Sequence, residues 1–182
     1  MAERRNVRWG LALVLALVLG QGACNTQVDS ESRLLDEACA VDQCTTTGAA
    51  RATTGLTSDS LAFQVGPGPG KVVIPLPAFS HAGDSSFRLE ALVSGAATAR
   101  LLRATCATDA GPCSTQVVDT SILYAHDYDW QSVGNHSTGS SSTSFSGFEV
   151  EIETTANQEI AVVDLRYDTY DTVTCSVYAP GR

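Results

Sequence analysis

The sequence predicts an all-β protein, an antiparallel β-sandwich of jelly-roll or Greek-key type. A short N-terminal helix and then a tether are expected to precede the sandwich. From Leu61 onward, apolar and polar residues alternate with a period of two, as they do in strands with one buried and one solvated face. Stretches rich in glycine, proline and serine separate these segments at the short intervals typical of sandwiches. The chain of 182 residues is long enough for one such domain behind a leader.

The alternation is clearest in the segments 87–93, 148–153, 161–168 and 173–177. Less regular strands are expected at 61–65, 71–76, 97–105 and 116–132. Proline has no backbone N–H to give to a neighbouring strand, so Pro75 and Pro77 predict that 71–76 lies at a sheet edge. Short strands separated by turn residues in this way favour a sandwich.

Before the first of these strands the sequence changes character twice. Ser30 is suited to cap a short helix over 31–42, whose apolar residues recur at helical spacing. Residues 45–60 are small and polar, and we interpret them as a tether or irregular lead-in. The predicted organisation is therefore a signal peptide at 1–23, a segment with helix and tether at 24–60, and the β-sandwich domain at 61–182.

The first residues have the organisation of an export signal. Arg4, Arg5 and Arg8 precede the apolar run at 11–19, and small residues follow it up to Cys24. Nine apolar residues are far fewer than the roughly 20 that a membrane-spanning helix needs. The segment is therefore predicted to be removed on export rather than to anchor the chain as a helix.

The end of this leader, Gly22-Ala23-Cys24, resembles the lipobox of bacterial envelope lipoproteins and departs from it at Gln21, where leucine is usual. The resemblance implies that Cys24 becomes a lipidated N-terminus, with enough acyl chains for stable anchoring. Asn25 follows it, with no aspartate to suggest inner-membrane retention, so the outer membrane or cell surface is the expected location. Ordinary cleavage after Gly22 is the alternative, and it would leave a periplasmic or secreted protein.

The charge of the chain excludes one class of partner. The net charge is −9, and removing 1–23 takes away three arginines and one glutamate, which leaves eight basic and 19 acidic residues. A chain this acidic, without a run of lysine or arginine, lacks the positive surface that nucleic acid requires. The same charge favours solubility and can attract divalent cations.

Six cysteines stand at 24, 39, 44, 106, 113 and 175, and export would place them where disulfides persist. Cys106 and Cys113 bracket a turn-rich loop between two strands, so we predict that they are bridged. Cys39 and Cys44 are near enough in sequence to close a small loop, although either can instead pair with Cys175. Neither CxxC spacing nor a Cys/His cluster is present, which argues against zinc.

The most unusual stretch is 124–130. In an extended strand, Tyr124, His126, Tyr128 and Trp130 share one face. If that face is exposed, its rings and polar groups can bind a carbohydrate ligand; the alternative interpretation is that the rings belong to the core, where large aromatics usually lie. Asp127 and Asp129 would share the other face and are candidate ligands for calcium, which prefers carboxylate oxygens. No other cofactor is expected.

The sequence does not predict an enzyme. Its histidines are His81, His126 and His136, and neither GxSxG nor HExxH occurs. We expect a non-catalytic outer-membrane or cell-surface lipoprotein that contacts envelope proteins, as the interaction component of a machine for adhesion, motility or secretion. The alternative is a carbohydrate-binding β-sandwich module that uses 124–130, and a secreted hydrolase is a distant third.

Lipidation can be tested by metabolic labelling. Labelled palmitate is expected to enter the wild-type protein and not the Cys24→Ala variant, because only the thiol of residue 24 can begin the modification. The measurement is autoradiography of the immunoprecipitated protein. Absence of label from both forms contradicts the prediction.

Overall fold

The computed structural model describes residues 23–32, 34–39, 44–56, 60–78, 86–106, 113–137 and 146–174, with the backbone alone for 23–32, 34, 106, 113 and 171–174. The compact unit that contains most of the sheet spans Gln27–Asp171. No helix in these ranges is both long and apolar enough to cross a membrane.

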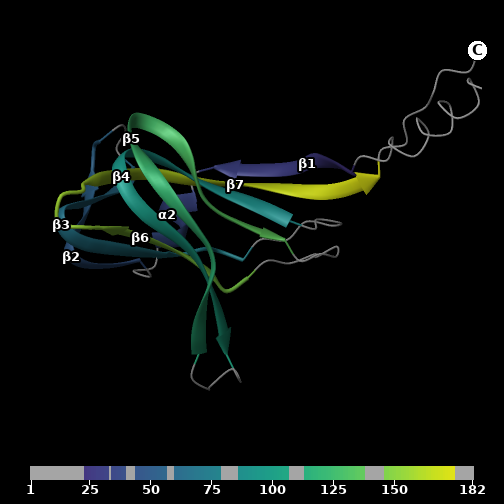
Figure 1. Cartoon of the computed structure of the whole chain (residues 1–182), viewed down its shortest axis with the longest axis horizontal. Coiled ribbons are helices and arrows are strands. Elements are labelled where there is room, and N and C mark those ends of the chain that lie inside the picture. The colour runs from purple at the N-terminus through teal and green to yellow at the C-terminus, as the bar shows by residue number, and fades with distance from the viewer. Residues whose placement is uncertain are drawn as a thin grey trace, which may run out of the picture. The chain divides into compact units, whose positions relative to one another are not determined.

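Strands dominate the described chain (Figure 1), which confirms the predicted all-β class. The elements are β1 (Ala23–Ser32), α2 (Leu34–Cys39), β2 (Thr45–Thr54), β3 (Leu61–Pro75), β4 (Ser86–Cys106), β5 (Cys113–Ser137), β6 (Phe148–Thr154) and β7 (Ile160–Thr174). They pair in the order β1-β7-β3-β6-β4-β5, with β2 on β3 and an additional pairing of β4 with β7. Figure 1 shows β4 and β5 curving together as one long hairpin.

The sheet folds over into two layers because β3 and β4 each run through both. The first half of β4 pairs with β7, from Ser86↔Tyr170 to Gly95↔Ile160, and its second half pairs with β6. β3 does the same, with 63–65 on β7 and 70–75 on β6. Consequently β7 lies between β3 and β4 in one layer, and β6 lies between them in the other.

Glycine allows the long strands to bend where they pass between the layers. Gly66 in β3 and Gly95 in β4 have φ values of +97° and +113°, which side chains rarely tolerate. A Cβ at Gly95 would lie 2.1 Å from the Glu159 carbonyl oxygen, and the neighbouring Ala96 N–H donates to that oxygen at 3.0 Å. The bend in β4 therefore depends on a residue without a side chain.

The core lies between the layers and is made by the inward-facing residues of the alternating strands. Phe87 and Phe148 meet edge to face, with ring centroids 5.1 Å apart. The layers approach so closely that a Cβ on Gly134 would lie 2.6 Å from the Cβ of Leu101. Burying this apolar surface is the main favourable term in folding. Fully buried members include Val65, Ile74, Leu89, Leu101, Ile152, Ile160 and Leu165.

The predicted tether is wrong. Residues 45–54 form β2, which pairs with β3 from Thr45↔Val73 to Thr54↔Leu61 with one irregularity near Gly48. Most β2 side chains are small and exposed, so they show no apolar alternation, and main-chain hydrogen bonds to β3 hold the strand. The division between 24–60 and 61–182 therefore does not separate a linker from a domain.

The predicted helix over 31–42 is shorter than expected. α2 covers only Leu34–Cys39, and 31–32 belong to β1. Leu35 and Ala38 are buried in the core, and the Asp36 carboxylate accepts a hydrogen bond from the Leu61 N–H at 3.1 Å. The helix is thus packed against the start of β3.

The predicted edge position of 71–76 is also wrong. β3 has β6 on one side over 70–75 and β2 on the other as far as Val73. Pro75 lies beyond the last residue paired with β2, so the strand accommodates a proline without losing a bond to that neighbour.

Cys39 and Cys44 form a disulfide, with Cα atoms 5.1 Å apart, so the small loop is confirmed. Cys106 and Cys113 are direct register partners at the end of the β4–β5 hairpin. Their sulfur atoms lie outside the described side chains, and the bridge stays a prediction. Cys175 and His81 lie outside the described residues, as does the side chain of Cys24.

The bend at Gly95 can be tested by substitution. Gly95→Ala is expected to lower the free energy of unfolding by about 2–4 kcal/mol, because it adds backbone strain and a clash with the Glu159 carbonyl. Gly55 is the matched control, since it also has a positive φ but no atom lies within 4 Å of an added Cβ. Gly55→Ala should cost about 1 kcal/mol. Equal losses in urea unfolding of the two variants would contradict the role of the close contact.

Candidate functional site

The segment 124–130, which we call the β5 bend, carries two irregularities that the sequence did not predict. Three successive register pairs show them: Ala97↔Leu123, Gly95↔His126 and Val93↔Asp129. In each of the two intervals between these pairs, β5 has one residue more than β4. Extra residues of this kind are β-bulges, which turn side chains out of strict alternation. The single shared face predicted for the four rings is therefore interrupted.

The tyrosine rings of the β5 bend are in solvent. Tyr124 is 65% exposed and Tyr128 41%, and His126 is exposed as well. Trp130 is half-buried. The interpretation of these rings as core residues is thus wrong for both tyrosines and for His126. Tyr128 has a φ of +41°, a conformation in which a bulky residue is a clear outlier.

The side chain of Gln131 holds the β5 bend in place. Its Oε1 accepts a hydrogen bond from the Tyr124 N–H at 2.8 Å, and its Nε2 donates to the Tyr124 carbonyl at 2.9 Å. One amide side chain thereby satisfies both backbone groups of a residue at a bulge, where the ladder to β4 supplies no partner. The exposed ring of Tyr124 is therefore carried by a backbone that is fixed on both sides.

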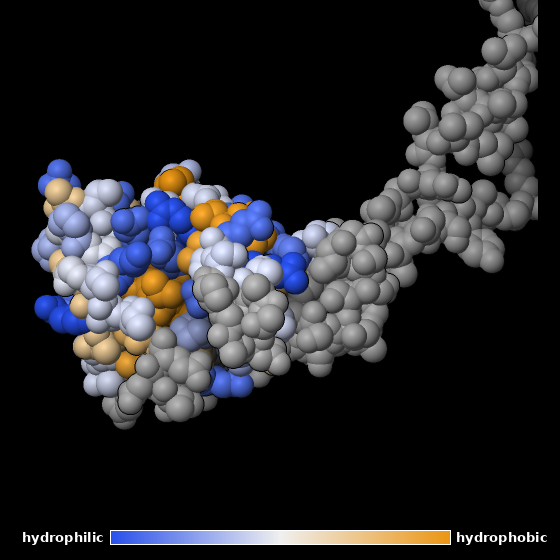
Figure 2. Space-filling model, turned by 90° about the horizontal axis from the view of Figure 1, so that it is seen from below, coloured by the Kyte–Doolittle hydropathy of each residue, from blue (hydrophilic) through white to orange (hydrophobic). Residues whose placement is uncertain are grey.

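Beside this bond is an open recess of about 440 Å³. It is lined by Ser121, Ile122, Tyr124, His126, Asp129, Gln131 and Ser132. The lining combines an aromatic ring with a carboxylate, an imidazole and hydroxyl groups. Such a surface can make an apolar contact and several hydrogen bonds to one small polar ligand. Figure 2 shows that apolar patches on one face of the domain are small and lie among hydrophilic residues.

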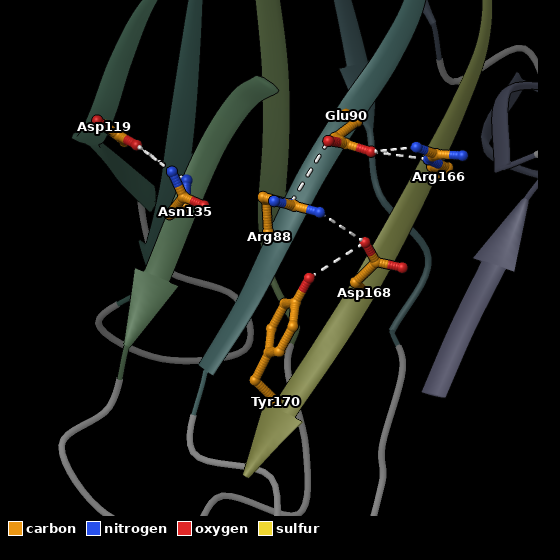
Figure 3. Close-up of polar contacts among 7 residues, drawn as sticks. All are labelled: Arg88, Glu90, Asp119, Asn135, Arg166, Asp168 and Tyr170. Carbon is orange, nitrogen blue, oxygen red and sulfur yellow. Dashed lines mark hydrogen bonds and ion pairs between the residues drawn. The ribbon is translucent and has the colours of Figure 1, made fainter. Parts of the chain in front are cut away.

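An ion-pair ladder covers the outer face of β4 and β7 (Figure 3), formed by Arg88, Glu90, Arg166 and Asp168. Arg166 pairs with Glu90 at 2.6 Å, and Arg88 pairs with Asp168 at 3.2 Å. Glu90 and Asp168 are only 9% and 7% exposed. Two arginines and two carboxylates cancel in charge, so the ladder satisfies buried carboxylates without creating a charged patch.

Aromatic rings stand at both ends of this ladder. The Arg166 guanidinium lies 4.3 Å from the centroid of the Trp130 ring, and Tyr170 donates a hydrogen bond to Asp168 at 3.3 Å. Burial, together with Asp168, raises the pKa of Tyr170. Burial alone would lower the pKa of Arg88, but its hydrogen bond with Asp168 and the charge of Glu90 outweigh burial and raise that pKa. The Trp130 ring is thus covered in part by the Arg166 guanidinium, whereas the rings of Tyr124 and Tyr128 are exposed to solvent.

A second set of ion pairs lies on β3, β4 and β6. Glu151 pairs with Lys71 at 3.0 Å and with Arg100 at 2.6 Å, and Arg100 also reaches Glu153 at 2.6 Å. Burial alone would raise the pKa of Glu151, but its hydrogen bonds and charge interactions with Lys71 and Arg100 outweigh burial and lower that pKa. Glu151 and Glu153, on the polar side of β6, are therefore both held in ion pairs.

The sequence predicted neither set of ion pairs. The only signal was the placing of arginines and acids on the polar side of alternating strands, and their partners depend on strand register. His136 was not singled out either. It packs against both Phe87 and Phe148, and burial, with a smaller effect of Arg103, lowers its pKa.

The described ranges contain no group of three or more His, Cys, Asp or Glu side chains able to hold a metal ion. Calcium binding by Asp127 and Asp129 remains a prediction from the sequence.

No protein-family model matches the chain, and no curated protein does. Solved structures with a similar chain path include the modules of an endo-1,4-beta-D-xylanase 10B of Clostridium thermocellum complexed with xylohexaose, at 12% identity and a TM-score of 0.41. That match covers 88% of this chain and 28% of the other, so the chain spans under a third of the enzyme structure.

Two carbohydrate-binding modules of Clostridium thermocellum are also similar. The C-terminal family 22 module of the same xylanase matches at 9% identity and a TM-score of 0.37, over 79% of this chain and 92% of the module. A family 11 module in complex with a mixed-linked tetrasaccharide matches at 9% identity and 0.33, over 86% and 90%. Similarity at this level transfers neither a ligand nor an activity to this chain.

Removing one partner from the ladder should be costly. Glu90→Gln is expected to lower the free energy of unfolding by about 3 kcal/mol, because it leaves Arg166 without its partly buried counter-ion. Glu153→Gln is the matched control: its side chain is 44% exposed and Arg100 keeps Glu151, so the loss should be below about 1 kcal/mol. Urea unfolding measures both. Equal losses would show that burial of the pair is unimportant.

Proposed function

We propose that this domain is a non-catalytic module that binds carbohydrate at the β5 bend. One observation carries the proposal: the exposed ring of Tyr124 lines a recess that also contains His126 and Asp129. A sugar presents apolar C–H groups on its ring face and hydroxyls at its edge. A flat aromatic ring next to hydrogen-bonding side chains complements both at once.

The backbone at Tyr128 supports this interpretation. A φ of +41° suits glycine or asparagine and is unfavourable for tyrosine. Strained residues of this kind cluster at binding sites, where function rather than stability selects the side chain. A tyrosine that is both strained and 41% exposed contributes little to packing. We infer that its ring is there to contact a ligand, and we base this on the surface itself rather than on the weak structural likeness.

The expected lipid anchor would determine where in the cell this binding takes place. If Cys24 is lipidated, the chain would hold a carbohydrate-binding surface at the outer membrane or cell surface. We then propose that the protein attaches to an extracellular or envelope glycan. This role is one form of the adhesion function expected from the sequence.

A protein-contact role is the second candidate, and one observation favours it. Among the described strands β5 pairs only with β4, so its other edge has no strand partner. Val117 and Ile122 on this strand are 51% and 57% exposed. An open edge with exposed apolar side chains is suited to addition of a strand from an envelope protein.

The rings can be tested separately from the fold. Tyr124→Ala is expected to weaken binding to an immobilised polysaccharide by about tenfold or more, the loss typical of an aromatic anchor. Tyr128→Gly should weaken binding too, while raising the free energy of unfolding by about 1 kcal/mol through relief of strain. Affinity electrophoresis measures the first effect and urea unfolding the second.

Val117→Ala is the control, since it removes an exposed apolar side chain that does not line the recess. It should leave polysaccharide binding unchanged. Binding that survives both tyrosine substitutions would contradict the proposed site, and a wild-type protein that binds no glycan would leave the protein-contact role as the better candidate.

A further inference from the structure

We infer that the glycan bound at the β5 bend is neutral, and that the Asp129 carboxylate selects against acidic sugars. This inference rests on the proposed function and specifies its ligand class. It follows from which charges the recess contains and from how the nearby arginines are used.

The recess offers an acidic ligand nothing positive to bind. None of its lining residues is lysine or arginine, and Asp129 supplies a carboxylate. Within the described part of the chain, neither the Asp129 side chain nor the His126 side chain has a hydrogen-bond or ion-pair partner. The carboxylate is therefore available to accept hydrogen bonds from hydroxyl groups, and bonds to an ionised acceptor are the stronger kind.

The arginine that contacts the β5 bend is already engaged. Arg166 stacks on Trp130, the residue next to Asp129, and its guanidinium is paired with Glu90. Recruiting it to a ligand carboxylate or sulfate would leave the partly buried Glu90 without its counter-ion, which is costly. The ladder thus keeps its positive charge away from the recess.

The field of the whole protein acts in the same direction. The chain carries 20 acidic and 11 basic residues, and several of the basic ones are paired in the two sets of ion pairs. A negative surface lowers the local concentration of anions. A uronic acid or sulfated sugar would meet repulsion on approach and again at Asp129, whereas a neutral sugar would meet neither.

The experiment measures binding of the full chain to neutral polysaccharides (glucan, xylan, mannan and galactan) and to acidic ones (polygalacturonate, alginate and heparin) at low and high salt. Neutral ligands are expected to bind with an affinity that changes by less than about twofold with salt, since no ion pair is formed. Asp129→Asn should weaken their binding by about five- to tenfold through loss of one charge-assisted hydrogen bond. The same variant should strengthen any residual binding of acidic ligands.

Glu37→Gln is the matched control, because it removes the same charge from an exposed position on α2. Preferential, salt-sensitive binding of acidic polysaccharides would overturn the inference and leave the proposed function standing. Equal effects of Asp129→Asn and Glu37→Gln on neutral ligands would also overturn it, as the carboxylate would then not touch the sugar. Absence of binding to both sets of glycans would reject the proposed function itself. Circular dichroism of both variants confirms that they are folded.

Discussion

The whole arrangement depends on the close approach of two backbones at Gly95. The Glu159 carbonyl oxygen accepts a hydrogen bond from Ala96 where a side chain on Gly95 would have to lie. That contact bends β4 and places the turn between β6 and β7 against it. Because β3 bends through its own glycines at the matching level, the same four strands can face one another across a core. Without the bend there would be a flat sheet with both faces exposed.

The β5 bend follows from the same constraint. β5 pairs with β4 along both layers, so it must turn where β4 turns, and it does so with two bulges around His126 instead of a glycine. Bulges leave backbone groups without ladder partners, and Gln131 supplies those partners for Tyr124. The exposed rings are therefore a product of folding one hairpin across two layers. The ion-pair ladder on β4 and β7 closes the neighbouring face and keeps Trp130 in one place.

The sequence predicted the parts of the fold that side-chain burial controls. The segments 87–93, 148–153 and 161–168 alternate because one face of β4, β6 and β7 is in the core, and their assignment as strands is confirmed. β2 was missed because its stability comes from main-chain pairing, which leaves no apolar pattern. The bulges at the β5 bend and the partners of Arg88 and Arg166 were missed because both depend on register between strands far apart in sequence.

The bulges in β5 also affect how the edge of this strand could pair with a second chain. A long, regular open edge invites another chain to pair with it, and fibres grow from such contacts. The doubled irregularity around His126 interrupts the row of evenly spaced backbone groups that a second strand would need. An incoming strand can therefore pair continuously along only part of this edge, on one side of the bend or the other. The distortion that turns the tyrosines toward solvent thus also shortens the stretch of regular edge on which a second chain could pair.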